Sequence, residues 1–208
     1  MQRTQDILTT LRMFQEENLD VRTVTLGVNL LDCADPDTAR LCRKVRDKVR
    51  RHAGELVRIC EGVEHRYGIP IVNRRLAFTP LASIVAGGRR EAFCQIAEEL
   101  DDTVEEVGVD LAGGFSALVH KGMTTSDEAL IRAIPHAMSR TERLCASINV
   151  ASTAAGINVS AINLIARQIR SLAQETQERD GFGAAKLSVF ANMPEDNPFM
   201  AGAMLGFG

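Results

Sequence analysis

Short apolar runs alternate with amphipathic segments along this chain of 208 residues, and this alternation restricts the possible folds. Alternating apolar side chains predict a first strand over Val21–Leu31. Further strands are expected over 69–75, 108–112, 144–151 and 186–191. Strands that are separated by helices form parallel sheets with right-handed crossovers. We therefore expect an α/β fold with five parallel strands, in one domain over residues 1–208.

Between these strands, apolar residues three or four positions apart predict helices. The expected helices are, in chain order, Thr4–Glu17, one long helix that starts at Asp35-Pro36-Asp37 and runs to Tyr67, Arg90–Val107, a helix that begins at Ser126 and is interrupted at Pro135, and a helix that begins at Asn158 or Ser160.

Composition narrows the class of protein. Hydrophobic residues make up 45% of the chain, which is enough for a buried core. The formal net charge is -3 and the pI is about 5.8, so no overall basic field attracts nucleic acid or an anionic membrane. No apolar run reaches the roughly 18 residues of a membrane span, and a cytoplasmic protein is expected. Five widely spaced cysteines without a Cys-x-x-Cys pair predict reduced thiols.

Two carboxylates and an amide follow the last expected strand closely, as Glu195, Asp196 and Asn197. In parallel α/β folds, ligands bind beyond the carboxyl ends of the strands. Glu195 and Asp196 are therefore candidate catalytic acid–base residues, or ligands for a divalent cation such as magnesium or calcium. The alternative is that they begin a helix, where acidic side chains accept hydrogen bonds from free amides.

Asn73, Arg74, Arg75 and Thr79 come at the expected end of the second strand. A pair of guanidinium groups can clamp a carboxylate or a phosphate, so these residues are candidates for substrate binding. Surface ion pairs explain such arginines equally well.

Gly113, Gly114 and Ser116 follow the expected third strand, with Lys121 shortly after them. Backbone amides in a glycine-rich turn can approach an anion, although the pattern of a P-loop is absent. The alternative is a turn that only reverses the chain.

Several motifs together resemble those of uncharacterised bacterial and archaeal proteins known as the PFL family. The matching segments are Thr25–Cys33, Gly68–Arg75, Gly113–Val119, Lys121–Thr124, Thr141–Cys145 and Phe190–Gly202. The resemblance implies half of a ten-stranded α/β barrel like that of pyruvate formate-lyase, since family members are about twice this long. A half barrel has unpaired sheet edges, so we expect a homo-oligomer or a complementing second half-barrel chain. The chain departs from the family at Met204–Gly206, where a His is usual.

The resemblance raises the question of radical chemistry, which needs a cysteine inside the barrel. Cys33 and Cys145 are the candidates, although a buried thiol is more often a small core side chain. Asp32 would disfavour a thiolate at Cys33. The sequence contains no radical-bearing glycine motif like that of the lyases, so we expect chemistry that does not depend on a radical.

The residues favour an enzyme that binds a small anionic metabolite at the carboxyl ends of the strands. The alternative is a non-catalytic regulatory or scaffolding protein that assembles with a partner chain. A third hypothesis is RNA binding by the basic residues between Arg40 and Arg51, but no aromatic residues interleave with them for base stacking.

Overall fold

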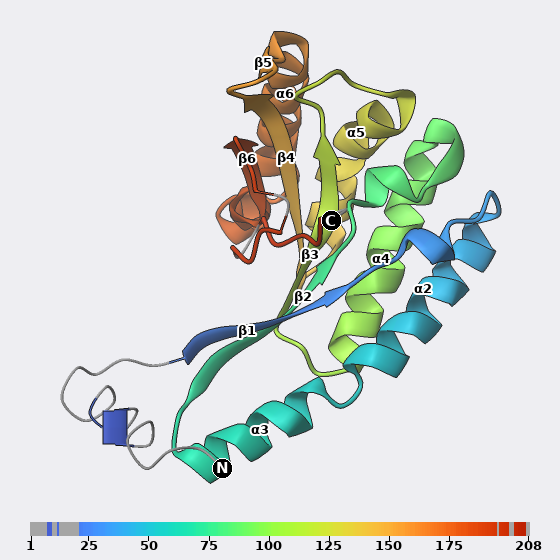
Figure 1. Ribbon diagram of the computed structural model, residues 1–208. Helices are drawn as coiled ribbons and strands as arrows, with labels where there is room; N and C mark the ends of the chain where they lie inside the picture. Colours follow the sequence, from blue (N-terminus) through green and yellow to red (C-terminus); the bar gives the residue numbers. More distant parts are fainter. Residues whose placement is uncertain (1–7, 10–11, 13–20, 195, 200–201, 207–208) are drawn as a thin grey trace.

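The computed structural model describes residues 8–9, 12, 21–194, 196–199 and 202–206 (Figure 1). Its strands are β1 (Val21–Val28), β2 (Ile71–Phe78), β3 (Leu111–Leu118), β4 (Leu144–Ser152), β5 (Gly156–Ile157) and β6 (Leu187–Ala191). Its longer helices are α2 (Thr38–Ala53), α3 (Leu56–Tyr67), α4 (Arg90–Glu106), α5 (Thr125–Arg140) and α6 (Val159–Glu175). The helix expected over Thr4–Glu17 falls almost wholly outside the described residues.

The strands form one sheet in the order β1-β2-β3-β4-β6. These five strands are parallel, and the short β5 pairs antiparallel with the end of β4. The parallel strands lie side by side in the order in which they occur in the sequence. Right-handed crossovers between such strands place every connecting helix on the same face of the sheet. The expected α/β fold with a mostly parallel sheet is therefore confirmed.

Helices cover one face of this sheet, and the end of the chain crosses the other (Figure 1). The helix-covered face holds the apolar core, in which the rings of Phe93 and Phe115 meet edge to face at 6.2 Å. We call residues 196–199 and 202–206 the C-terminal strap. Leu205 of the strap packs on Gly27, and its backbone N–H donates to the carbonyl oxygen of Phe78 at 3.0 Å.

The face under the strap is the inner face of the sheet. Parallel strands place paired residues on the same side, so the register identifies its members. Polar side chains of the inner face include Thr23, Thr25, Asn73, Arg75, Ser116, Ser147, Asn149 and Ser188.

The prediction of a single long helix is wrong, because α2 ends at Ala53 and a separate helix, α3, begins at Leu56. Gly54 lies at the break, and glycine has a low helix propensity. The helical spacing of apolar residues continues from α2 into α3 because both helices pack on the same sheet, and this spacing hid the break in the sequence. The first part is well buried through Leu41, Val45 and Val49, whereas Cys60 is the buried residue of α3.

The expected ends of the second and third strands are also wrong. Asn73, Arg74 and Arg75 lie inside β2, because the apolar run Leu76-Ala77-Phe78 continues the strand beyond them. Gly113, Gly114 and Ser116 lie inside β3 rather than in a turn. The ladder between β3 and β4 shifts register between Ala112 and Phe115, and Gly114 has φ +122° there, which favours glycine.

Two helix details differ from the prediction. Thr124, not Ser126, caps α5, in a reciprocal capping box with Asp127. Pro135 does not interrupt this helix, which runs unbroken to Arg140. Packing of α5 between α4 and α6 offsets the lost backbone hydrogen bond. Asn158 caps α6 by accepting from the Ala161 backbone, as expected.

Candidate functional site

A cavity of about 440 Å³ lies at the carboxyl edge of the sheet, where β3, β4 and β6 end together. We call it the edge cavity. Its lining residues are Leu118, His120, Lys121, Asn149, Ser152, Asn192, Met193, Pro194, Met204 and Gly206. This edge is where parallel α/β folds bind their ligands.

His120 and Asn149 form a side-chain pair within the lining. The amide of Asn149 lies 3.1 Å from Nδ1 of His120. With Oδ1 turned toward the ring, Nδ2 of Asn149 donates to the carbonyl oxygens of Phe190 and Ala151 at 3.1 Å each. That orientation satisfies both ends of the amide and assigns the neutral ring its proton at Nδ1. Nε2 of His120 is then the acceptor, as a general acid–base group requires.

Lys121 gives the edge cavity its charge. It is an exposed lysine just beyond β3, and it makes no ion pair among the described residues. None of the described lining residues carries a carboxylate. The field of such a cavity favours an anion.

Asn192 fixes the rim of the edge cavity where β6 ends. Its backbone has φ +53°, a conformation that asparagine adopts more readily than most residues. Its side-chain Oδ1 accepts from the backbone N–H and the hydroxyl of Thr153, at 2.7 and 3.1 Å. The loops after β4 and β6 are thus tied together beside the cavity.

Of the candidates named from the sequence, Lys121 lies in this lining. Asn73 pairs with Thr23 in the amino-terminal half of β2, away from the carboxyl edge. Arg74 forms an ion pair with Glu64 of α3, with 2.9 Å between Nη2 and Oε2. Arg74 thus fits the alternative given for these arginines, an ion pair between elements of the fold.

The other candidates on β2 and β3 have different positions. Arg75 and Ser116 lie on the inner face, where Ser116 Oγ is 3.8 Å from the sulfur of Met204. Gly113 allows the strap to pass, because a Cβ there would lie 1.9 Å from the Ala203 carbonyl oxygen. Thr79 is buried, and its hydroxyl accepts from the Leu30 backbone at 2.7 Å, which ties two strand ends together.

In the C-terminal strap, Asp196 and Asn197 organise the backbone. Oδ1 of Asp196 accepts from the Gly206 N–H at 2.8 Å. Asn197 and Met204 exchange backbone hydrogen bonds of 3.1 and 2.9 Å across the strap. Asp196 therefore holds a loop together and does not begin a helix. Glu195 lies outside the described residues.

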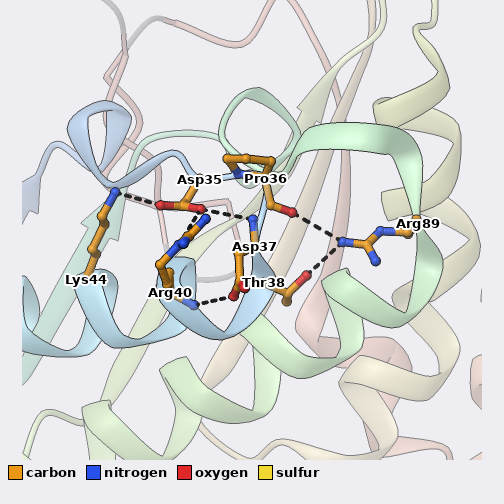
Figure 2. Close-up of polar contacts among 7 residues, drawn as sticks. All are labelled: Asp35, Pro36, Asp37, Thr38, Arg40, Lys44 and Arg89. Carbon is orange, nitrogen blue, oxygen red and sulfur yellow. Dashed lines mark hydrogen bonds and ion pairs between the residues drawn. The ribbon is translucent and has the colours of Figure 1, made fainter.

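A network of polar contacts organises the loop after β1 (Figure 2). Oδ1 of Asp35 accepts from the Asp37 backbone at 2.9 Å and from Nε of Arg40 at 3.1 Å, and Lys44 reaches Oδ2 at 3.0 Å. The Asp37 N–H, then Lys44 and Arg40, lower the pKa of Asp35 to about 2. Arg89 joins from the next loop through the Thr38 hydroxyl at 3.1 Å.

Several basic residues of α2 are paired with acids. Arg46 lies 3.0 Å from Glu99, Arg50 lies 2.6 Å from Glu106, and Lys48 contacts Asp32. These pairs favour a solvated helix face over a surface for RNA.

The two thiols considered for radical chemistry are held in the neutral form. Burial raises the pKa of Cys145 to about 11, against the opposing charges of Lys186 and Arg75. Burial and then the Asp32 carboxylate raise the pKa of Cys33, as expected for that neighbour. A thiol with a raised pKa is a weak nucleophile at neutral pH.

Among the described residues, no three His, Cys, Asp or Glu side chains lie together as candidate metal ligands. Within that same part of the chain, no helix is both long and apolar enough to cross a membrane.

Sequence reasoning missed His120, Asn149 and Asn192. A signal existed for Asn149, because an asparagine inside the apolar run Leu144–Ala151 is unusual for a buried strand. His120 and Asn192 lie just beyond the ends of strands, but the third strand was expected to end too early to bring His120 to the carboxyl edge.

These features define an α/β protein with a mostly parallel sheet, helices on one face, and a cavity at the carboxyl edge that has Lys121 in its lining. A family model described as "Uncharacterised ACR (DUF711)" matches residues 12–208, and the chain belongs to this family. The expectation of a family of unknown function that covers nearly the whole chain is thereby confirmed.

Relatives named "UPF0210 protein" are similar to this chain over almost all of its length. Those of Halothermothrix orenii and Desulforudis audaxviator are 51% and 52% identical over 203 residues, which cover 98% of this chain and 45% of each relative. That of Methanosarcina acetivorans is 48% identical over 203 residues, or 98% of this chain and 44% of the relative. The chain thus spans about half the length of the curated relatives that it matches, and their names assign no activity.

Proposed function

We propose that this chain binds a small anionic metabolite in the edge cavity, as part of an enzyme that does not depend on a radical. The observation that carries the proposal is a cavity at the carboxyl edge whose described lining holds Lys121 and no carboxylate. Ligand sites are concave, with a few polar groups that fix the orientation of the ligand. Lys121 supplies charge, and the amides of Asn149 and Asn192 lie in the same wall.

His120 is the acid–base residue of this proposal. Its Nδ1 is engaged by Asn149, so the ring is held in one orientation and one tautomer. An anion on Lys121 would bring its neighbouring atoms close to the adjacent imidazole, where Nε2 can take up or return a proton. Asp196 remains a second acid–base candidate, because its partner Gly206 lines the cavity. Glu195, and a divalent cation such as magnesium or calcium, stay in the proposal on sequence grounds alone.

A binding experiment with one charge-removing variant tests the proposal. Inorganic phosphate and succinate serve as probes in thermal-shift titrations of the wild type, Lys121→Gln and Arg170→Gln. Arg170→Gln is the matched control, because it removes one positive charge from an exposed position of α6. We expect Lys121→Gln to weaken the binding of one probe by about tenfold or more, as for loss of a charge-assisted hydrogen bond. Equal binding by wild type and Lys121→Gln would remove the edge cavity as the anion site.

A scaffolding function is the second candidate, and the outer edge of the sheet favours it. Among the strands that the structure describes, β6 pairs with β4 alone. Beside this edge, Phe182, Val189 and Ile169 are 63%, 42% and 38% exposed. Unpaired strands next to exposed apolar side chains are typical of association surfaces. A second copy, or a complementing half-barrel chain, would continue the sheet there toward a barrel like that of pyruvate formate-lyase.

Val189→Lys tests the assembly by placing a charge on this edge. Sedimentation equilibrium of the wild type should give a mass above that of one chain, and Val189→Lys should give a single chain. Two results together would exclude the assembly. The wild type would be a monomer at all protein concentrations, and its mass would not increase when it is mixed with the separately expressed remainder of a relative.

A further inference from the structure

Arg75 is a buried cation that has no counterion among the described residues. Its side chain projects from the middle of β2 onto the inner face, and the residue is 8% exposed. Nη1 donates to the carbonyl oxygen of Pro198 at 3.3 Å, and Nε has no hydrogen-bond partner in the described part of the chain. No described carboxylate forms an ion pair with it. Since buried charges are normally paired, this position calls for an anion.

Two further polar atoms are buried and unpartnered on the same face. Asn197 is 2% exposed, and its Oδ1 already accepts from the Phe199 N–H at 3.0 Å, which leaves Nδ2 without an acceptor among the described residues. Ser147 is 1% exposed, and its hydroxyl likewise lacks a described partner. Such atoms are rare in folded proteins, because a buried polar atom that stays unpaired destabilises the fold.

The three groups belong to one region. Asn197 is bonded directly to Pro198, whose carbonyl oxygen accepts from Arg75. Ser147 of β4 pairs in register with Ser116 of β3, which lies on the same face beneath the strap. The strap covers this region, because Met204 pairs with Asn197 and its sulfur contacts Ser116.

The chemistry of these groups is that of an oxyanion receptor. A guanidinium Nε–H and an amide Nδ2 only donate hydrogen bonds, and a serine hydroxyl can donate as well. Together they offer one positive charge and three donors, a set that suits a carboxylate or a phosphate. A cation would be repelled by Arg75, and an apolar ligand would leave all three donors unpaired.

We propose that Arg75, Asn197 and Ser147 form an interior site for an oxyanion group, a carboxylate or a phosphate, beneath the C-terminal strap. This site goes beyond the function proposed for the edge cavity, since it shares none of the lining residues of that cavity. Ligand entry requires the strap to lift, because the covering segment includes Met204 and Asn197 themselves.

The experiment observes the Arg75 side chain directly. The Nε–H signals of arginines are followed by ¹H–¹⁵N NMR in the Lys121→Gln protein, so that binding in the edge cavity does not contribute. Inorganic phosphate and succinate are titrated separately, and the probe that shifts the Arg75 signal identifies the class of oxyanion. Arg75→Gln should weaken binding by about tenfold or more and Asn197→Ala by about three- to tenfold. Arg132→Gln, which breaks the exposed pair with Glu128, should change nothing.

A stability reversal separates a binding role from a structural one. Without the anion, Arg75→Gln should melt at or above the temperature of the wild type, because it removes an unpaired buried charge. With a saturating probe, the wild type should melt higher than Arg75→Gln. Arg75→Lys keeps the charge and loses Nε–H, so it should bind with intermediate affinity.

Absence of a shift at Arg75 with both probes at tens of millimolar would overturn the interior site. Equal affinities for Lys121→Gln and for Lys121→Gln with Arg75→Gln would do the same. These outcomes are independent of the edge cavity, whose failure is read from Lys121→Gln alone.

Discussion

The helix-covered face of the sheet and its inner face differ in the side chains that each one buries. On the helix side, Leu76, Phe78 and Phe115 belong to a continuous apolar core. On the inner side, the same strands carry Arg75 and Ser116. Adjacent residues of one strand thus serve different purposes, because successive side chains point to opposite faces. The helix side therefore buries the apolar area that stabilises the fold, whereas the inner side holds the polar groups from which the oxyanion site is proposed.

The neighbours Phe115 and Ser116 test this difference most directly. Phe115→Ala removes a fully buried ring that packs on Phe93, and should lower the free energy of unfolding by about 3–5 kcal/mol. Ser116→Ala removes a buried hydroxyl on the inner face and should lower it by about 1 kcal/mol. Urea denaturation measures both. Similar losses for the two variants would mean that the faces contribute equally to stability.

A smaller effect is expected where the strap touches the inner face. In Gly113→Ala, the new Cβ would lie 1.9 Å from the Ala203 carbonyl oxygen, so the strap must move. Such overpacking should cost about 1–3 kcal/mol and increase proteolysis within the strap. Gly62→Ala is the control, because a Cβ at this exposed position of α3 meets no atom within 4 Å. It should stabilise the protein by about 0.5–1 kcal/mol. Unchanged proteolysis in Gly113→Ala would show that the strap does not rest on β3.

The sequence predicted the helix-covered face far better than the inner face. Apolar periodicity located α4, β4 and α6 closely, because burial against the sheet imposes a regular spacing. The same reasoning ended β2 too early at Arg75, and ended β3 too early before Gly113, since polar residues and glycines are typical of turns. They lie inside strands here because the inner face is polar and the strap must approach closely.

The candidate site was predicted only in part for the same reason. The expected position at the carboxyl edge followed from the order of strands and helices, and Lys121, a candidate from the sequence, lies in the lining there. The pairing of His120 with Asn149 did not, because it depends on the register between β3 and β4. Local sequence patterns do not encode that register, which tertiary packing sets.

The smallest effect should come from charge rather than packing, at the loop after β1. The pKa of Asp35 is lowered from 3.8 to about 2 by the Asp37 N–H, Lys44 and Arg40. A carboxyl whose pKa is lowered by folding adds stability above its unfolded pKa, and that stability is lost as the pH falls through the folded pKa. The Asp35 contribution should therefore be complete above about pH 4 and disappear toward pH 2. Its partners Arg40 and Lys44 are about half exposed, so solvent and salt screen the ion pairs, and the loss should be small.

The free energy of unfolding, measured against pH, should therefore fall less steeply between pH 4 and 2 in Asp35→Asn than in the wild type. The control variant Asp102→Asn, at an exposed position of α4, should keep the wild-type slope. If Asp35→Asn instead destabilised the protein as much as Phe115→Ala, the loop would belong with the packed core, and the contrast between packed and polar regions would need to be redrawn.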